Sequence, residues 1–113
     1  MSPDDFTAFA ALEREGWARV APDYEDTFGR CTSLAIPALL DLARLAPGAR
    51  MLDVACGPGY AAAAAVARGA RASGLDLSSG MIERARAACP AGEFKVGDAQ
   101  ALPWNDSEFD AVV

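Results

Sequence analysis

The chain has 113 residues, of which 52% are hydrophobic, and it carries a formal net charge of −6 with no histidine. This length allows one domain, and the hydrophobic fraction is enough for a packed core. The acidic balance argues against a nucleic-acid partner, and the lack of histidine excludes Ser–His–Asp and Cys–His catalysis within these residues.

No apolar run reaches the ~18 residues that a membrane span requires, so no membrane span is predicted. Asp4 and Asp5 stand where a secretory signal would carry basic residues. Cys31, Cys56 and Cys89 are odd in number and widely spaced, which fits neither a disulfide framework nor a zinc site. We therefore expect a cytoplasmic protein without a metal site.

The first 46 residues are predicted to form a helical cover. Ser2–Asp5 supplies a capping hydroxyl, a proline and two acids for the first turn of a helix that should end at Gly16. A short helix is expected from about Asp23, after the break at Pro22. Another is expected from about Ser33 to Leu45. Pro37 would lie in its first turn or kink it. Its expected apolar side is formed by Leu39, Leu40, Leu42 and Leu45.

Residues 47–113 alternate between strand and helix patterns. The predicted strands are Arg50–Ala55, Arg71–Leu77, Glu93–Val96, with Phe94 and Val96 inward, and Phe109–Val113 as the beginning of a fourth. The predicted helices are Gly59–Arg68 and Ser79–Cys89, the second capped by Ser78 or Ser79. This order implies parallel βαβ units, and hence an α/β fold with a Rossmann-like parallel sheet behind N-terminal helices.

The first predicted strand runs into a glycine turn. Asp53 lies within the strand, Gly57 and Gly59 form the turn, and a helix opens at once. Bare backbone at the glycines lets a ligand approach the main chain, and the helix directs free N–H groups toward it. This turn predicts a nucleotide-like cofactor.

Carboxylates occur near the ends of three successive strands, at Asp53, Asp76 and Asp98. Strand ends of an open α/β sheet face the ligand crevice. Asp76 is placed to accept hydrogen bonds from both hydroxyls of an adenosine ribose. Asp98 is placed to accept a hydrogen bond from the adenine amino group. Leu77 and Met81 could enclose the adenine ring. The alternative for each acid alone is a helix cap or a turn.

The glycine pattern and the carboxylates also distinguish between a dinucleotide and S-adenosylmethionine as the cofactor. A dinucleotide site favours Gly-x-Gly-x-x-Gly around a pyrophosphate, whereas here Ala62 stands at the third glycine position and Asp53 would repel a diphosphate. S-adenosylmethionine carries an ammonium, a sulfonium and a ribose diol, and it suits an acidic pocket.

Four segments together resemble class I S-adenosylmethionine-dependent methyltransferases, with the ubiquinone and menaquinone biosynthesis subgroup most similar. They are Leu52–Tyr60 (the glycine motif), Gly74–Met81 (the acidic motif of the second strand), Gly97–Trp104 and Ser107–Val113. The segment from Trp17 to Tyr24 resembles that subgroup's cover over the cofactor.

The resemblance implies roles for individual residues. Asp53, Ala55 and the backbone of Gly57 and Gly59 would hold the methionine end of the cofactor. Asp76 would bind the ribose hydroxyls. Leu77 and Met81 would contact the two faces of the adenine ring, and Asp98 with the Ala99 N–H would bind its edge. Tyr24 would touch the methionine carboxylate or else pack among the helices, and packing is the favoured interpretation for Trp17.

Members of this family are roughly twice as long, as an α/β domain of normal size would be. The segment that follows the fourth strand there forms the acceptor pocket, so no catalytic residue is assigned. We expect the donor-binding half of a domain that methylates a small-molecule acceptor, weakly active or inactive alone, and paired as a homodimer through an exposed Phe109–Val113 edge.

Two other functions stay open at this point. The chain could be a catalytically inactive fragment or interaction module, which would bind no cofactor. It could also be a fragment of an NAD-binding oxidoreductase, against which Asp53 and Ala62 argue.

Overall fold

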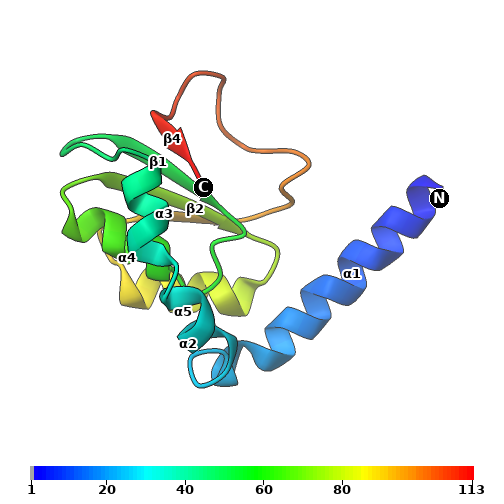
Figure 1. Ribbon diagram of the computed structural model, residues 1–113. Coiled ribbons are helices and arrows are strands. Elements are labelled where there is room, and N and C mark those ends of the chain that lie inside the picture. The colour runs from blue at the N-terminus through cyan, green and yellow to red at the C-terminus, as the bar shows by residue number, and fades with distance from the viewer. Residues whose placement is uncertain (1) are drawn as a thin grey trace.

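Four strands form one parallel sheet in the order β3-β2-β1-β4 (Figure 1). The strands are β1 (Arg50–Val54), β2 (Arg71–Asp76), β3 (Glu93–Val96) and β4 (Ala111–Val112). The coordinates are a computed structural model that describes residues 2–113, so Met1 of the predicted domain lies outside the described residues. The sheet and the helices that precede it confirm the Rossmann-like fold.

One face of the sheet is covered by α4 (Tyr60–Ala67) and α5 (Ser79–Ala88). Met51 and Ala72 are paired across β1 and β2, and both are buried with Phe94 of β3 in the core beneath these helices. Small side chains on α4, among them the buried Ala62 and Ala65, let that helix lie close to the strands. The packing of this alanine-rich helix against the sheet therefore stabilises it.

The other face of the sheet carries the alternate residues of the strands. Arg50 of β1 and Ser73 of β2 lie there, and so does Lys95 of β3. The loop of residues 97–110 runs across this side before it enters β4 (Figure 1). Trp104 and Phe109 of the loop are half-buried and meet edge to face, with ring centroids 5.6 Å apart.

The N-terminal segment forms α1 (Pro3–Val20), a 3-10 turn η1 (Ala21–Asp23), α2 (Phe28–Ser33) and α3 (Ile36–Leu42). Figure 1 shows α1 projecting from the body, with its C-terminal end nearest α2 and α5. The predicted cap is present, because the Ser2 hydroxyl accepts from the Asp5 N–H and the Asp5 carboxylate accepts from the Ser2 N–H. No residue of α1 is buried.

The prediction that Gly16 ends the first helix is wrong. α1 continues through Gly16, where two i,i+4 side-chain pairs support the helix: the Trp17 indole donates to Glu13, and Arg19 pairs with Glu15. The short helix expected from about Asp23, after a break at Pro22, is also wrong: Pro22 lies within η1, residues 24–27 form a turn, and α2 begins at Phe28.

The single helix expected from Ser33 to Leu45 is also wrong, because α2 ends at Ser33 and α3 begins at Ile36. Pro37 lies in the first turn of α3, where its missing N–H costs nothing. On α3, Leu40 is buried as expected, whereas Leu42 is 82% exposed.

The sheet prediction fails at Val96, which was expected to point inward and is 49% exposed, since β3 is a short edge strand and Val96 is its last residue. The fourth strand is shorter than the predicted Phe109–Val113, although the N–H of Val113 still donates to the Leu52 carbonyl. Among the helices of residues 2–113, none is long and apolar enough to cross a membrane.

Candidate cofactor site

The site begins at the turn that follows β1. Ala55, Gly57 and Gly59 all have positive φ angles, of 58°, 53° and 85°. Gly59 is the N-cap of α4, and a Cβ there would lie 3.0 Å from the Cβ of Ala85 on α5. Ala55 adopts a left-handed conformation that a side chain disfavours, and strain of this kind gathers at binding sites.

Asp76 ties this turn to the end of β2. Its Oδ2 accepts a hydrogen bond from the Gly57 N–H at 2.9 Å, and its Oδ1 accepts one from the Ser78 N–H at 2.9 Å. The carboxylate therefore fixes both loops at the carboxyl edge of the sheet. Each oxygen keeps acceptor capacity for a further donor.

Asp53 lies behind the turn and is only 8% exposed. Burial raises the pKa of this carboxyl from 3.8 to about 7, and the neighbouring Asp76 charge adds to the shift. Burial also raises the pKa of the Cys56 thiol, with Asp53 and Asp76 contributing. The field around the turn is thus negative, and it favours a ligand with positive charge.

A pocket of about 270 Å³ opens in front of the turn. Six of the residues proposed from the sequence line it: Tyr24, Ala55, Gly57, Asp76, Leu77 and Met81. Gly59 instead lies against Ala85, and Asp53 is buried near the pocket without lining it. The strand ends and the N-terminal segment thus bring together residues far apart in the chain, such as Tyr24 and Met81, which are 57 positions apart.

Two further residues from α1, Glu13 and Trp17, complete the pocket lining. The Trp17 Nε1–H donates to Glu13 Oε2 at 2.9 Å. Trp17 also lies edge to face with Tyr24, with ring centroids 6.1 Å apart, and Tyr24 lies near Tyr60. The sequence favours packing for Trp17 and assigns no ligand contact to Glu13, although Glu13 lies within the predicted first helix.

Asp98 and Ala99 lie away from this pocket. Asp98 lines a second groove, of about 530 Å³, together with Phe6, Ala10 and Arg14 of α1, which also contributes to the pocket. The Asp98 Oδ1 accepts from the Gln100 N–H at 2.9 Å. Ala99 is exposed beside Leu102 on the loop of residues 97–110. The two candidate adenine contacts therefore stand next to the site rather than inside it.

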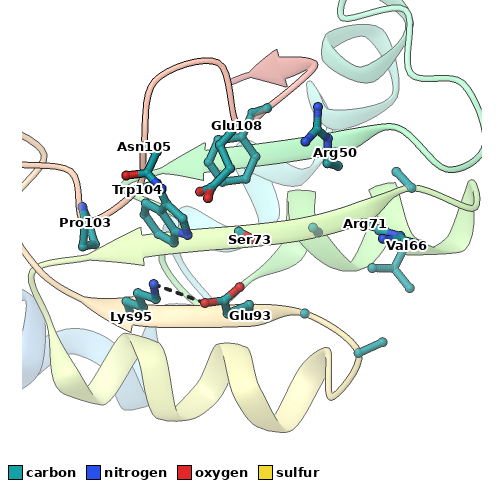
Figure 2. A pocket seen from close by; sticks show the side chains of 15 residues that line it. Arg50, Val66, Arg71, Ser73, Glu93, Lys95, Pro103, Trp104, Asn105 and Glu108 are labelled. Atoms are coloured by element: carbon teal, nitrogen blue, oxygen red, sulfur yellow. Dashed lines mark ion pairs between the residues drawn. The ribbon is translucent and has the colours of Figure 1, made fainter.

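A larger depression of about 730 Å³ lies on the opposite face of the sheet (Figure 2). Figure 2 shows that Trp104 and Glu108 lie over the strands. Lys95 forms an ion pair with Glu93 at 3.2 Å. The depression extends toward the first residues of β1 and β2, Arg50 and Arg71. Ligands of open α/β sheets bind at the carboxyl ends, so this depression is separate from the cofactor site.

Within residues 2–113, no group of three or more Cys, Asp or Glu side chains is arranged to hold a metal ion. The carboxylates around the glycine turn face a pocket with aromatic and glycine walls. Their chemistry fits an organic cation better than a hard metal ion.

Residues 51–113 match a protein-family model described as a methyltransferase domain. A demethylmenaquinone methyltransferase of Renibacterium salmoninarum is 39% identical over 74 residues, which cover 66% of this chain and 31% of that protein. The chain spans between 31% and 39% of the length of curated relatives that it matches, this one included.

Solved structures agree with the family match. A methyltransferase of Thiobacillus denitrificans in complex with S-adenosylhomocysteine has a TM-score of 0.60 at 28% identity, covering 68% of this chain and 34% of the other. A Haloferax volcanii chain solved with the Trm112 methyltransferase activator has a TM-score of 0.69 at 32% identity, covering 85% and 45%. The chain belongs to the methyltransferase-domain family, among the class I S-adenosylmethionine-dependent methyltransferases.

Proposed function

We propose that this chain binds S-adenosylmethionine in the 270 Å³ pocket and provides the donor side of methyl transfer to a small-molecule acceptor. The observation that carries the proposal is the Asp76 carboxylate, which joins the glycine turn to the next loop inside a negatively charged pocket. No Lys or Arg lines this pocket, which disfavours the diphosphate of a dinucleotide. The relative solved with S-adenosylhomocysteine supports the choice of cofactor.

The bound cofactor would supply a methyl group already activated on a sulfonium, so the chain's task is alignment and exclusion of water. We assign the ribose hydroxyls to Asp76 and the faces of the adenine to Leu77 and Met81. The methionine end would lie over Ala55 and the N–H groups of the Gly57–Gly59 turn, near the buried Asp53.

Tyr24 would contact the methionine end from the side of the N-terminal helices, since it lines the pocket opposite the glycine turn. Asp98 and the Ala99 N–H are proposed for the adenine edge. Because Asp98 lies in the second groove, this contact requires the loop of residues 97–110 to approach the pocket when the cofactor binds. No residue is assigned to the acceptor or to a proton transfer.

Isothermal titration of S-adenosylhomocysteine into the purified chain tests the donor site. We expect binding to the wild-type chain, and a weakening of about tenfold or more in Asp76→Asn, which keeps the shape of the side chain but removes its charge. No binding to a folded wild-type chain would reject the proposed function.

Asp110→Asn serves as the matched control for that titration. Its carboxylate also accepts from a backbone N–H, that of Arg50 at 2.8 Å, but it lies at the opposite end of β1. The Asp110→Asn variant should bind S-adenosylhomocysteine with the affinity of the wild-type chain. An equal loss in both variants would mean that general destabilisation, rather than the site, explains the effect of Asp76→Asn.

We also propose that two copies pair through the exposed edge of β4, where Val112 is largely exposed and the strand has one neighbour in the sheet. The Haloferax volcanii relative solved with a protein partner supports protein contacts within the family. Light scattering at rising concentration should show a dimer, and Val112→Lys should weaken it. A monomer at all concentrations would reject this pairing.

We propose the cytoplasm as the compartment of this chain, because Cys31, Cys56 and Cys89 are all free thiols. Fractionation of cells that express the chain would test the compartment.

A further inference from the structure

One carboxylate occupies the side of α1 that faces the rest of the chain. Ala10 and Glu13 are the two least exposed residues of α1, and Trp17, at 37% exposed, lines the same pocket as Glu13, so these residues mark the inward side. Such a side is normally apolar. Phe6 and Trp17 share this side and are 47% and 37% exposed, whereas Phe9 and Leu12 lie elsewhere on the helix and are 59% and 66% exposed. Glu13 therefore stands where packing alone would favour a hydrophobic residue.

The position of Glu13 is fixed by a neighbour on the same helix. Trp17 lies one turn further along α1, and its Nε1–H donates to Glu13 Oε2 at 2.9 Å. Both residues line the pocket in front of the glycine turn. The hydrogen bond holds the carboxylate at the pocket wall and leaves its other oxygen without a partner among the described contacts, able to accept from or attract a ligand.

The pocket is negatively charged on more than one side. Glu13 and Asp76 come from different elements and both line it, Asp53 is buried behind it, and no Lys or Arg is part of its wall. The aromatic side chains of Trp17 and Tyr24 also line the pocket, and aromatic rings attract a cation that lies over their faces. A cationic ligand is favoured here over a neutral ligand of the same shape.

We propose that Glu13 makes the site prefer the cationic methyl donor over the neutral product of the reaction. This inference rests on the proposed function. The donor has a sulfonium, an ammonium and a carboxylate, which sum to a net charge of +1. A nucleophilic atom of the acceptor supplies an electron pair to the methyl carbon while the bond from sulfur to methyl breaks and both its electrons stay on sulfur. The sulfur product is neutral, and the positive charge passes to the methylated acceptor, which loses it as a proton. The attraction to Glu13 weakens at that step, which favours exchange of product for fresh donor.

Titration calorimetry with three ligands tests this preference. S-adenosylmethionine and sinefungin both carry net positive charge, because sinefungin has an amine-bearing carbon in place of the methylated sulfur, whereas S-adenosylhomocysteine is neutral. In Glu13→Gln we expect both cations to bind about fivefold more weakly, as for one charge interaction across a partly solvated pocket. S-adenosylhomocysteine should stay within about twofold of its wild-type affinity.

Glu15→Gln is the matched control, because it makes the same substitution on the same helix. The Glu15 side chain is 72% exposed and pairs with Arg19 at 3.1 Å, away from the pocket. Its three affinities should equal those of the wild-type chain. If it reproduces the effect of Glu13→Gln, long-range charge rather than the position of Glu13 explains the preference, and the inference is wrong.

Other results separate the inference from the proposed function. An equal weakening of all three ligands in Glu13→Gln would mean that Glu13 only holds α1 in place, and no change would mean that it does not reach the ligand. Either outcome overturns the inference alone. Failure of all three ligands to bind the wild-type chain would overturn the proposed function and this inference together.

Discussion

Asp76 accepts a hydrogen bond from the backbone N–H of Gly57, although nineteen positions separate the two residues. The same carboxylate accepts from the N–H of Ser78, which begins the next helix. One side chain therefore satisfies a backbone donor in each of the two loops that frame the pocket. This arrangement explains how the turn after β1 keeps its left-handed residues in place before any ligand binds.

Replacing Asp76 by alanine should lower the free energy of unfolding by about 1–3 kcal/mol, because two backbone N–H groups lose a charged acceptor. Urea denaturation at pH 7 measures this. Asp98→Ala is the comparison, since its carboxylate accepts only from Gln100 in its own turn. A loss as large in Asp98→Ala would show that the link between loops contributes nothing beyond a local turn.

Asp53 should make stability depend on pH. Its folded pKa of about 7 lies above its unfolded value of 3.8, so the folded chain binds the extra proton between these values. Stability contributed by this group is therefore highest below pH 4, falls as pH rises toward 7, and is constant above that. The difference between the two pKa values of Asp53 corresponds to at most about 4 kcal/mol of stability.

Asp53→Asn removes this titration, so its stability should exceed that of the wild-type chain most clearly at pH 8 and approach it near pH 4. Urea denaturation of both proteins across this range gives the difference curve. A difference that does not change with pH would contradict the raised pKa. Asp110→Asn is a useful second comparison, because hydrogen bonds from Arg50 lower the pKa of Asp110 instead.

Gly59→Ala should be more destabilising than Gly48→Ala. Both glycines have left-handed φ angles, 85° and 82°, but a Cβ at Gly59 would meet Ala85 at 3.0 Å while one at Gly48 meets nothing within 4 Å. An alanine with a left-handed φ angle is strained by about 1 kcal/mol, and this cost is common to both variants. Steric overlap adds about 1–3 kcal/mol for Gly59→Ala alone.

Thermal unfolding of both glycine variants checks this difference. Combining Gly59→Ala with Ala85→Gly removes the contact with the Ala85 Cβ but leaves the contact with its Cα at 3.1 Å, so the double variant should be less destabilised than the sum of the single changes without recovering the wild-type stability. Strict additivity would show that α4 and α5 adjust freely, and that the close approach at Gly59 is not required.

Ser78→Ala should cost about 1 kcal/mol, because the fully buried hydroxyl of Ser78 caps α5 by accepting from the Met81 N–H at 3.2 Å. Ser2→Ala removes a similar cap from α1, where every residue is at least partly exposed, so it should reduce helicity with little effect on global unfolding. Circular dichroism and urea denaturation together separate the two. Equal losses of global stability would contradict this distinction.

The sheet core could be predicted from the sequence with few errors. Glu93–Val96 and the beginnings of β1 and β2 were correct, because buried apolar runs bounded by glycine or polar residues have few other solutions in a parallel sheet. The pattern also predicted that Asp76 stands at a strand end beside the glycine turn. Its hydrogen bond to Gly57 depends on loop geometry that spacing alone does not specify.

The N-terminal helices were predicted less well, since their limits depend on weak local effects. Gly16 was expected to end a helix, yet side-chain pairs on either side of it allow α1 to continue and bring Trp17 to the pocket. Glu13 lies within the predicted helix, but its contact with the pocket depends on how α1 packs against the sheet, which helical spacing alone does not specify. Propensity is a weak guide to where such a helix ends, because i,i+4 side-chain pairs that span Gly16 offset the cost of one glycine.

The way α1 is attached has a consequence for kinetics. Its residues contribute part of the pocket wall, yet none of them is buried, so releasing the helix exposes little apolar surface and costs far less than unfolding the sheet. Ligand entry and exit can then proceed through detachment of the helix. The association rate would follow how often α1 lifts, and amide exchange in α1 should slow once the pocket is filled.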